Sequence, residues 1–180
     1  MNEADRVIPY QPNDLATPAE LVAAIRHRRG GEFLNLDRML LHSVPLATGW
    51  NALLKEVREN LTLDPMLREL AMCAVAVLNG AEYEFIQHAP VFLRAGGTQR
   101  QLDALRLIGT ANFNPDVFDS VQREAAELTL QMTRTIEVDD SLMQNLQARM
   151  GNQALVELVG TIAAYNMVSR FLLALKVTPE

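Results

Sequence analysis

The sequence has little of the chemistry on which thiol, disulfide and metal sites are built. Its 180 residues include one cysteine, Cys73, and three histidines. A single cysteine excludes an intrachain disulfide and is typical of a reducing compartment, so we expect a cytoplasmic protein. The one pair with ligand-like spacing is Glu84 and His88. One such pair is too little for a metal site, and we therefore predict no metal.

Positive charge and long apolar runs are also scarce. The net charge of -6 and the pI near 5.1 argue against a nucleic-acid partner, which would require a basic face. No uncharged apolar run reaches the length of a membrane span. The N-terminal segment MNEADRVIPYQPND is polar and lacks the apolar region that is typical of a signal peptide. We therefore expect no membrane partner. With 49% hydrophobic and 21% charged residues, the chain has an ordinary globular composition.

Strand patterns are absent too, and the apolar residues recur at helical spacing. Three helix starts are indicated by a capping side chain before a proline, at Thr17-Pro18, Asp64-Pro65 and Asn114-Pro115, and a fourth by Thr98 with Gln101. We predict an all-α fold with an extended N-terminal arm over 1–16 and a single helical domain over 17–180. The expected helices cover residues 18–28, 36–43, 45–60, 65–78, 81–95, 98–108, 115–134, 139–150 and 152–175.

The last expected helix, over 152–175, is apolar on nearly every face. Helices of that kind are buried. In a chain of this size, burial on all sides favours a contribution from another subunit, so we predict a homo-oligomer. Arg170 places a charge in this apolar helix, where burial without a partner would be costly. Two interpretations stay open: a buried salt bridge to a glutamate, or an anchor for a substrate carboxylate.

The segment from Arg68 to Gly97, RELAMCAVAVLNGAEYEFIQHAPVFLRAGG, contains the strongest functional signal. Its pattern predicts two helices separated by Asn79-Gly80. If they form an antiparallel hairpin, Glu69 on the first helix meets His88 on the second. A paired carboxylate and imidazole are suited to moving a proton, with Glu84 or Tyr83 as a second polar contact.

This segment resembles the carboxymuconolactone decarboxylase family, which includes the AhpD-like alkylhydroperoxidases. The resemblance rests on Arg68-Glu69, on NGAEYE over 79–84, on His88 and on Arg94-Ala95-Gly96, and the downstream AAYNMVSRFLLAL also resembles the last helix of the family. It implies an AhpD-like helical fold, assembled as a homotrimer or as a homohexamer.

The peroxidase branch of that family uses the motif E-x11-C-x2-C-x3-H. Glu69 and His88 fall on its glutamate and histidine, but Ala81 and Glu84 occupy the cysteine positions. Thiol peroxidase chemistry needs an attacking and a resolving thiol, so an AhpD-like oxidoreductase is disfavoured. A peroxidase with one cysteine, Cys73, is the weaker variant of that alternative, because Cys73 reads as a small buried hydrophobic residue.

Members without the cysteine pair resemble the decarboxylase branch, which removes carbon dioxide from a small carboxylated lactone without metal or organic cofactor. The resemblance implies His88 as proton donor, Glu69 as its partner and Glu84 as a further catalytic candidate. Tyr83, Arg68 and Arg170 are the candidates for binding a small-molecule carboxylate substrate, with Arg94 as another possible anchor. A catalytically silent small-ligand-binding protein is the third alternative.

Overall fold

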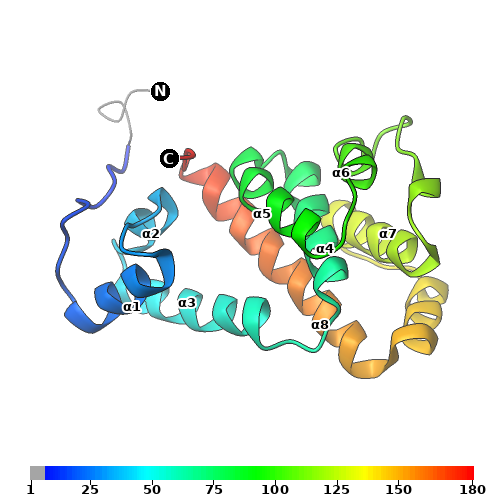
Figure 1. The fold of residues 1–180 in the computed structure, drawn as a ribbon, viewed down its shortest axis with the longest axis horizontal. Coiled ribbons are helices and arrows are strands. Elements are labelled where there is room, and N and C mark those ends of the chain that lie inside the picture. Colours follow the sequence, from blue (N-terminus) through cyan, green and yellow to red (C-terminus); the bar gives the residue numbers. More distant parts are fainter. Residues whose placement is uncertain (1–6) are drawn as a thin grey trace. The chain divides into compact units, whose positions relative to one another are not determined.

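A computed structural model describes residues 7–180, and over these residues the regular structure is helical, as the sequence predicts (Figure 1). By their contacts the described residues form two compact units, one over 7–60 with Ala174–Glu180 and the other over Leu61–Leu173. The helices are α1 (Ala19–Arg29), α2 (Asn35–Leu40), α3 (Val44–Glu59), α4 (Pro65–Asn79), α5 (Glu82–Arg94), α6 (Gln99–Leu105), the 3-10 helix η2 (Pro115–Val117), α7 (Ser120–Arg134) and α8 (Asp140–Ala174).

The first unit contains α1, α2 and α3, and its core is formed by side chains such as Ile25, Leu40 and Leu54, each 2% exposed or less. Residues 9–16, which belong to the predicted arm, are not helical, and residues 1–6 of that arm lie outside the described part. Tyr10 is buried, and its hydroxyl accepts a hydrogen bond from the Thr178 amide at 2.9 Å. This section of the arm therefore packs on the C-terminal tail of its own unit.

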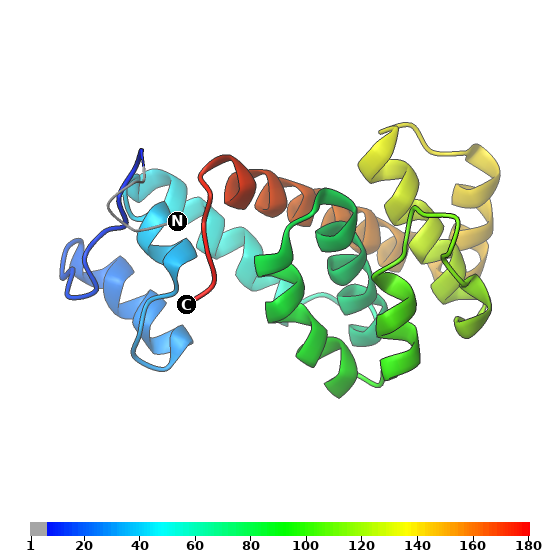
Figure 2. The same cartoon turned by 90° about the horizontal axis from the view of Figure 1, so that it is seen from above.

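The second unit is built around α4, whose residues from Glu69 to Ala76 are all buried. Helix α4 packs against α5 and α7. In both ribbon views α8 runs beside the pair of α4 and α5 (Figures 1 and 2). Asn166 on α8 is hydrogen-bonded to Asn79 of α4 and donates to Thr133 of α7, at 3.1 and 3.0 Å.

The helix-start predictions at Asp64 and Thr98 are confirmed. Asp64 accepts from the Leu67 amide at 3.0 Å, and Thr98 forms the predicted capping box with Gln101. The prediction for Thr17 is wrong, because α1 begins at Ala19 and Pro18, which has no side-chain acceptor, stands at the N-cap position.

The expected single helix over 115–134 is also wrong. Asn114 caps only the short η2, Phe118 is extended, and Asp119 forms a new capping box with Gln122 that starts α7. Asp119, an acidic cap five residues after Asn114, sets a new helix start, and the sequence interpretation overlooked it.

The break expected after residue 150 is present in α8, where Gly151 has φ 77° and leaves the helical conformation. Burial of its second half is incomplete, since Val156 is 70% exposed and Leu173 is 45% exposed. Among the described helices, α8 alone has the length and apolar composition of a membrane span. Within the protein, 56% of the most apolar 18-residue segment of α8 is buried. Core helices of soluble proteins have the same length and composition.

We predict that Gly97→Ala destabilises the second unit. A methyl group at Gly97 would lie 2.2 Å from Cε1 of Phe92, which is fully buried and has little room to move. Overpacking of this kind costs about 1–3 kcal/mol in the free energy of unfolding. Urea denaturation measures it, and Gly49→Ala is the matched control, because no atom lies within 4 Å of the added methyl there and the helix gains a better helix former.

Candidate functional site

The site begins with the turn that joins α4 to α5. Gly80 ends α4 in the left-handed region, with φ 71°, and the Ala81 amide donates to the Ala76 carbonyl at 2.8 Å. Glycine adopts this conformation without the steric penalty of a Cβ atom, so the chain can reverse immediately. Helix α5 then returns along α4, and side chains well before and well after the turn face each other.

Glu69 and His88 meet across this hairpin. His88 Nδ1 lies 2.7 Å from Glu69 Oε2, and the Glu69 side chain is 3% exposed against 13% for His88. An ionised carboxylate only accepts, so this bond places a proton on Nδ1 and leaves Nε2 as the nitrogen that exchanges a proton with a ligand. Tyr165 of α8 packs against the imidazole edge to face, with ring centroids 4.9 Å apart, and restricts its rotation.

Arg68 supplies a positive charge on the other side of Glu69. Its Nε lies 3.5 Å from Glu69 Oε1, which is ion-pair distance but not a hydrogen bond, and its side chain is 13% exposed. The Glu69 carboxylate is therefore shared between Arg68 and His88. The Arg68 Nε is fully buried against Glu69, so the Nη groups are the donors through which this guanidinium would meet a second anion.

Glu84 lies in a separate polar contact. It is 2% exposed, and the Ser169 hydroxyl of α8 lies 2.7 Å from its Oε2. The sequence interpretation expected Glu84 to give His88 a second contact, whereas its recorded hydrogen bond joins α5 to α8. Ser169 was missed, because nothing local links two residues that stand 85 positions apart.

The remaining predicted residues have mixed placements. Tyr83 is buried, at 6% exposure. Arg170 is exposed, and it donates to both the backbone and the side-chain oxygen of Asn166, at 3.0 and 2.7 Å. The buried salt bridge considered for Arg170 is therefore wrong: the long side chain reaches the helix surface and bonds one turn back. Arg94 is exposed at the end of α5.

Cys73 is fully buried in α4 between these carboxylates. Burial raises the pKa of its thiol well above the ordinary range, and the negative charges of Glu69 and Glu84 raise this pKa further. The thiolate, not the thiol, attacks peroxides and alkylating reagents. The setting of Cys73 therefore does not suit a peroxidatic cysteine.

We predict that Cys73 is inert in the folded protein. Because the pKa of its thiol is raised, the thiol stays protonated throughout the neutral range, and burial blocks access. At pH 7.5, a disulfide reagent such as DTNB is expected to titrate Cys73 in denaturant and to leave it unmodified in the native state. Rapid labelling without denaturant would contradict this placement.

Among the described residues, no group of three or more histidine, cysteine or carboxylate side chains is placed to hold a metal ion.

Solved structures with the same architecture have low sequence identity to this chain. An uncharacterised peroxidase-related protein from Silicibacter sp. TM1040 has a TM-score of 0.77 at 18% identity, covering 94% of this chain and 89% of that one. The AhpD core protein from Ralstonia eutropha JMP134, also peroxidase-related, has a TM-score of 0.78 at 14% identity, with 95% and 92% covered. A variant of the debrominase Bmp8 in complex with 2,3,4-tribromopyrrole has a TM-score of 0.77 at 16% identity, with 98% and 94% covered. At these identities the likeness establishes the fold alone.

No curated protein matches the chain. The model of the carboxymuconolactone decarboxylase family matches residues 45–126, a range that includes Arg68, Glu69, Glu84 and His88. The chain thus has an AhpD-like fold and is similar over residues 45–126 to the carboxymuconolactone decarboxylase family, and it lacks the CxxC pair.

Proposed function

We propose that the protein is a cofactor-free decarboxylase that acts on a small carboxylated lactone-like molecule. The observation that carries the proposal is the contact of 2.7 Å between the buried Glu69 carboxylate and Nδ1 of His88. It leaves Nε2 of His88 as the imidazole nitrogen for proton transfer. The family match supports this chemical class, and the substrate itself is part of the proposal.

In the proposed reaction the bond between the substrate carbon and its carboxylate breaks and carbon dioxide leaves. The electron pair stays on the substrate carbon, delocalised into the adjacent lactone system, and His88 Nε2 delivers a proton to that carbon. Glu69 holds the imidazole in position and balances the positive charge that it has when it carries both protons. Proton transfer by a positioned side chain contributes about 10²–10⁴-fold to rate.

Arg68 is the proposed anchor for a substrate carboxylate. It lies beside Glu69, is partly buried and retains hydrogen-bond donors, which suits recognition of a second anion. Arg170 is a weaker proposal, because both of its recorded hydrogen bonds go to Asn166. Glu84 and Tyr83, both buried on α5, remain proposals as a further catalytic residue and a substrate-binding residue.

We also propose that the protein acts as a cytoplasmic homotrimer or homohexamer. The exposed apolar side chains on α8, Val156, Met167 and Leu173, support assembly through this helix. Light scattering coupled to size exclusion measures the mass of the assembly.

The test of function is carbon dioxide release from a panel of carboxylated lactones. We expect turnover by the wild type on at least one of them and its loss in His88→Ala. The control is His42→Ala, since His42 lies in the other unit, where it contacts Gln11 and the Pro9 carbonyl. Turnover that survives His88→Ala would overturn the assignment. Binding of lactones without turnover would instead favour the silent ligand-binding alternative.

A further inference from the structure

The turn between α4 and α5 contains the one asparagine of the chain that is followed by glycine, Asn79-Gly80. In such a pair the backbone nitrogen of glycine can attack Cγ of the asparagine side chain, because glycine has no side chain of its own to shield that nitrogen. Ammonia leaves and a five-membered succinimide ring forms. Water then opens the ring at either carbonyl, which gives aspartate or isoaspartate, and the backbone of isoaspartate is one methylene longer.

The backbone of the turn holds the two reacting atoms apart. Asn79 is the last residue of α4, and ring closure requires it to leave the helical conformation. The attacking nitrogen is also occupied, since the Gly80 amide donates to the Val77 carbonyl at 3.0 Å. Attack on Cγ requires this amide to give up both its proton and its hydrogen bond. The turn therefore has to open before the ring can form.

The side chain of Asn79 is held in place as well. Its amide nitrogen donates to Oδ1 of Asn166 on α8 at 3.1 Å, and Arg170 Nη1 donates to the same oxygen at 2.7 Å. The Asn166 amide nitrogen donates to Thr133 at 3.0 Å and to the Ile162 carbonyl at 3.1 Å. All four hydrogen-bonding positions of the Asn166 amide are thus used, and the residue is buried. The acceptor of Asn79 is therefore fixed by three helices.

Water, the second reactant, has access to this turn. Gly80 is exposed and Asn79 is half-buried. No atom lies within 4 Å of the position that a Cβ of Gly80 would take. The geometry of Asn79, rather than exclusion of water, therefore keeps the pair unreactive.

We propose that Asn79-Gly80 is a deamidation site that the contact between Asn79 and Asn166 keeps closed in the native protein and that reacts when the turn opens. The product carries a carboxylate, which cannot donate to Oδ1 of Asn166, so the closed turn does not form again as before. The isoaspartyl product also lengthens the backbone between α4 and α5. That segment sets the 2.7 Å contact of Glu69 with His88, so one opening event can disrupt the site permanently.

The test measures deamidation by peptide mass mapping of the full-length protein after incubation at pH 8, in buffer and in guanidinium chloride. We expect Asn79 to react at least about tenfold more slowly in the native protein, because opening of a packed element costs free energy. Asn112 is the internal control, since it is exposed but followed by Phe113, and it is expected to stay largely unmodified in both conditions. Equal rates for Asn79 in the two conditions, or no reaction in denaturant, would overturn the proposal.

Variants of the residues around Asn166 separate the contact from general stability. Asn166→Ala removes the acceptor of Asn79 and is expected to raise the native rate about threefold to tenfold, the equivalent of one hydrogen bond. Thr133→Val is the matched control, because it removes a different bond of Asn166 and leaves the acceptor of Asn79 in place. Asn166→Asp keeps an oxygen for Asn79 and is also expected to react as the wild type does. If Asn166→Ala reacts no faster than Thr133→Val, the contact does not close the site.

The consequence for the turn is measured after the denaturant is removed. Isoaspartyl protein is expected to unfold at a lower urea concentration than unmodified protein that was denatured and refolded in parallel. Equal midpoints would show that the longer backbone is accommodated and would overturn the proposed loss of the turn. Every readout is covalent or conformational, so none of these results depends on the activity assigned to His88.

Discussion

Replacing Glu69 by glutamine is expected to reduce turnover by about 10²–10⁴-fold while the fold is retained. Glutamine has the same shape but no charge, so it no longer balances a doubly protonated His88 and no longer dictates which imidazole nitrogen carries the proton. The contact that is changed is the 2.7 Å bond from Oε2 to Nδ1. The effect is measured by steady-state kinetics on the carboxylated lactone that the wild type decarboxylates fastest.

The kinetic signature separates positioning from binding. If Glu69 acts through His88, Glu69→Gln lowers kcat and leaves KM nearly unchanged. If Arg68 anchors the substrate carboxylate, Arg68→Gln raises KM instead. Glu82→Gln is the control, because Glu82 is an exposed glutamate whose recorded ion pair, to Arg106, lies on the surface. A kcat of Glu69→Gln within threefold of the wild type would remove Glu69 from the mechanism.

How much of this site could be predicted depends on how local its parts are. Glu69 and His88 stand on two consecutive helices, and a glycine break between apolar helices indicates an antiparallel hairpin. Their encounter thus follows from spacing and helical period. The caps at Asp64 and Thr98 are still more local, because each involves a side chain and an amide three residues away.

Contacts between distant segments could not be predicted in this way. Ser169 reaches Glu84 and Tyr165 reaches His88 because α8 packs against the α4–α5 pair, and no periodicity in either segment specifies that register. Arg170 shows the same limit: an arginine in an apolar helix suggests a buried partner, but its side chain lies on the exposed side. Asp37 was missed as well, since an isolated aspartate gives no sign of two arginines from another helix.

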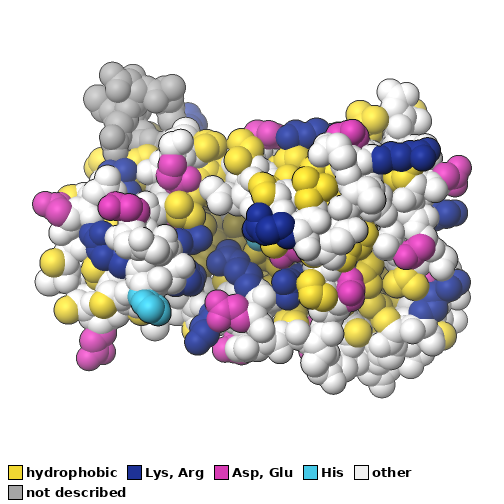
Figure 3. Space-filling view, viewed as in Figure 1, with side chains coloured by type: hydrophobic (Ala, Val, Ile, Leu, Met, Phe, Trp, Pro, Cys, Tyr) yellow, Lys and Arg dark blue, Asp and Glu magenta, His cyan; other side chains and the backbone are white. Residues whose placement is uncertain are grey.

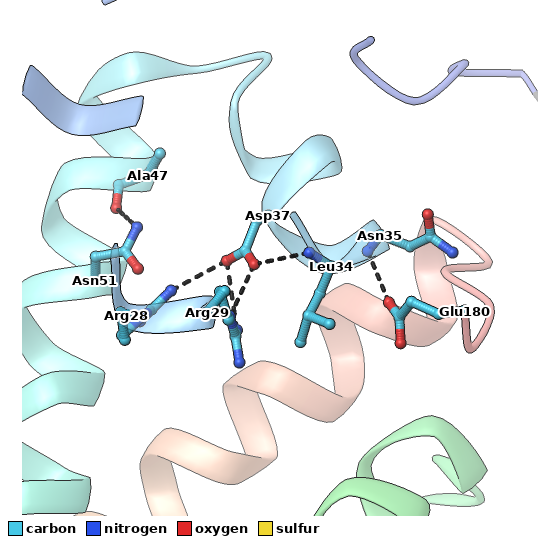
Figure 4. Close-up of polar contacts among 8 residues, drawn as sticks. All are labelled: Arg28, Arg29, Leu34, Asn35, Asp37, Ala47, Asn51 and Glu180. Carbon is cyan, nitrogen blue, oxygen red and sulfur yellow. Dashed lines mark hydrogen bonds and ion pairs between the residues drawn. The ribbon is translucent and has the colours of Figure 1, made fainter. Parts of the chain in front are cut away.

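Removing the Asp37 carboxylate is expected to have the largest effect on stability. Asp37 is 1% exposed and accepts from Arg28 at 3.1 Å, from Arg29 at 2.9 Å and from the Leu34 amide at 3.1 Å (Figure 4). Asp37→Ala would leave two partly buried guanidinium groups and an amide without their acceptor. The predicted loss is about 3 kcal/mol in the free energy of unfolding, at the low end for a broken buried pair, because the arginines are 23% and 20% exposed and water compensates them in part.

Urea denaturation of Asp37→Ala and Asp37→Asn separates the two roles of this carboxylate. Asparagine can still accept from the Leu34 amide at the start of α2 but carries no charge, so a loss close to that of alanine would assign the stability to the arginines. Asp103→Ala is the surface control, since Asp103 is exposed and its recorded contact is with Gln99. A loss below about 1 kcal/mol for Asp37→Ala would mean that solvent already satisfies both arginines.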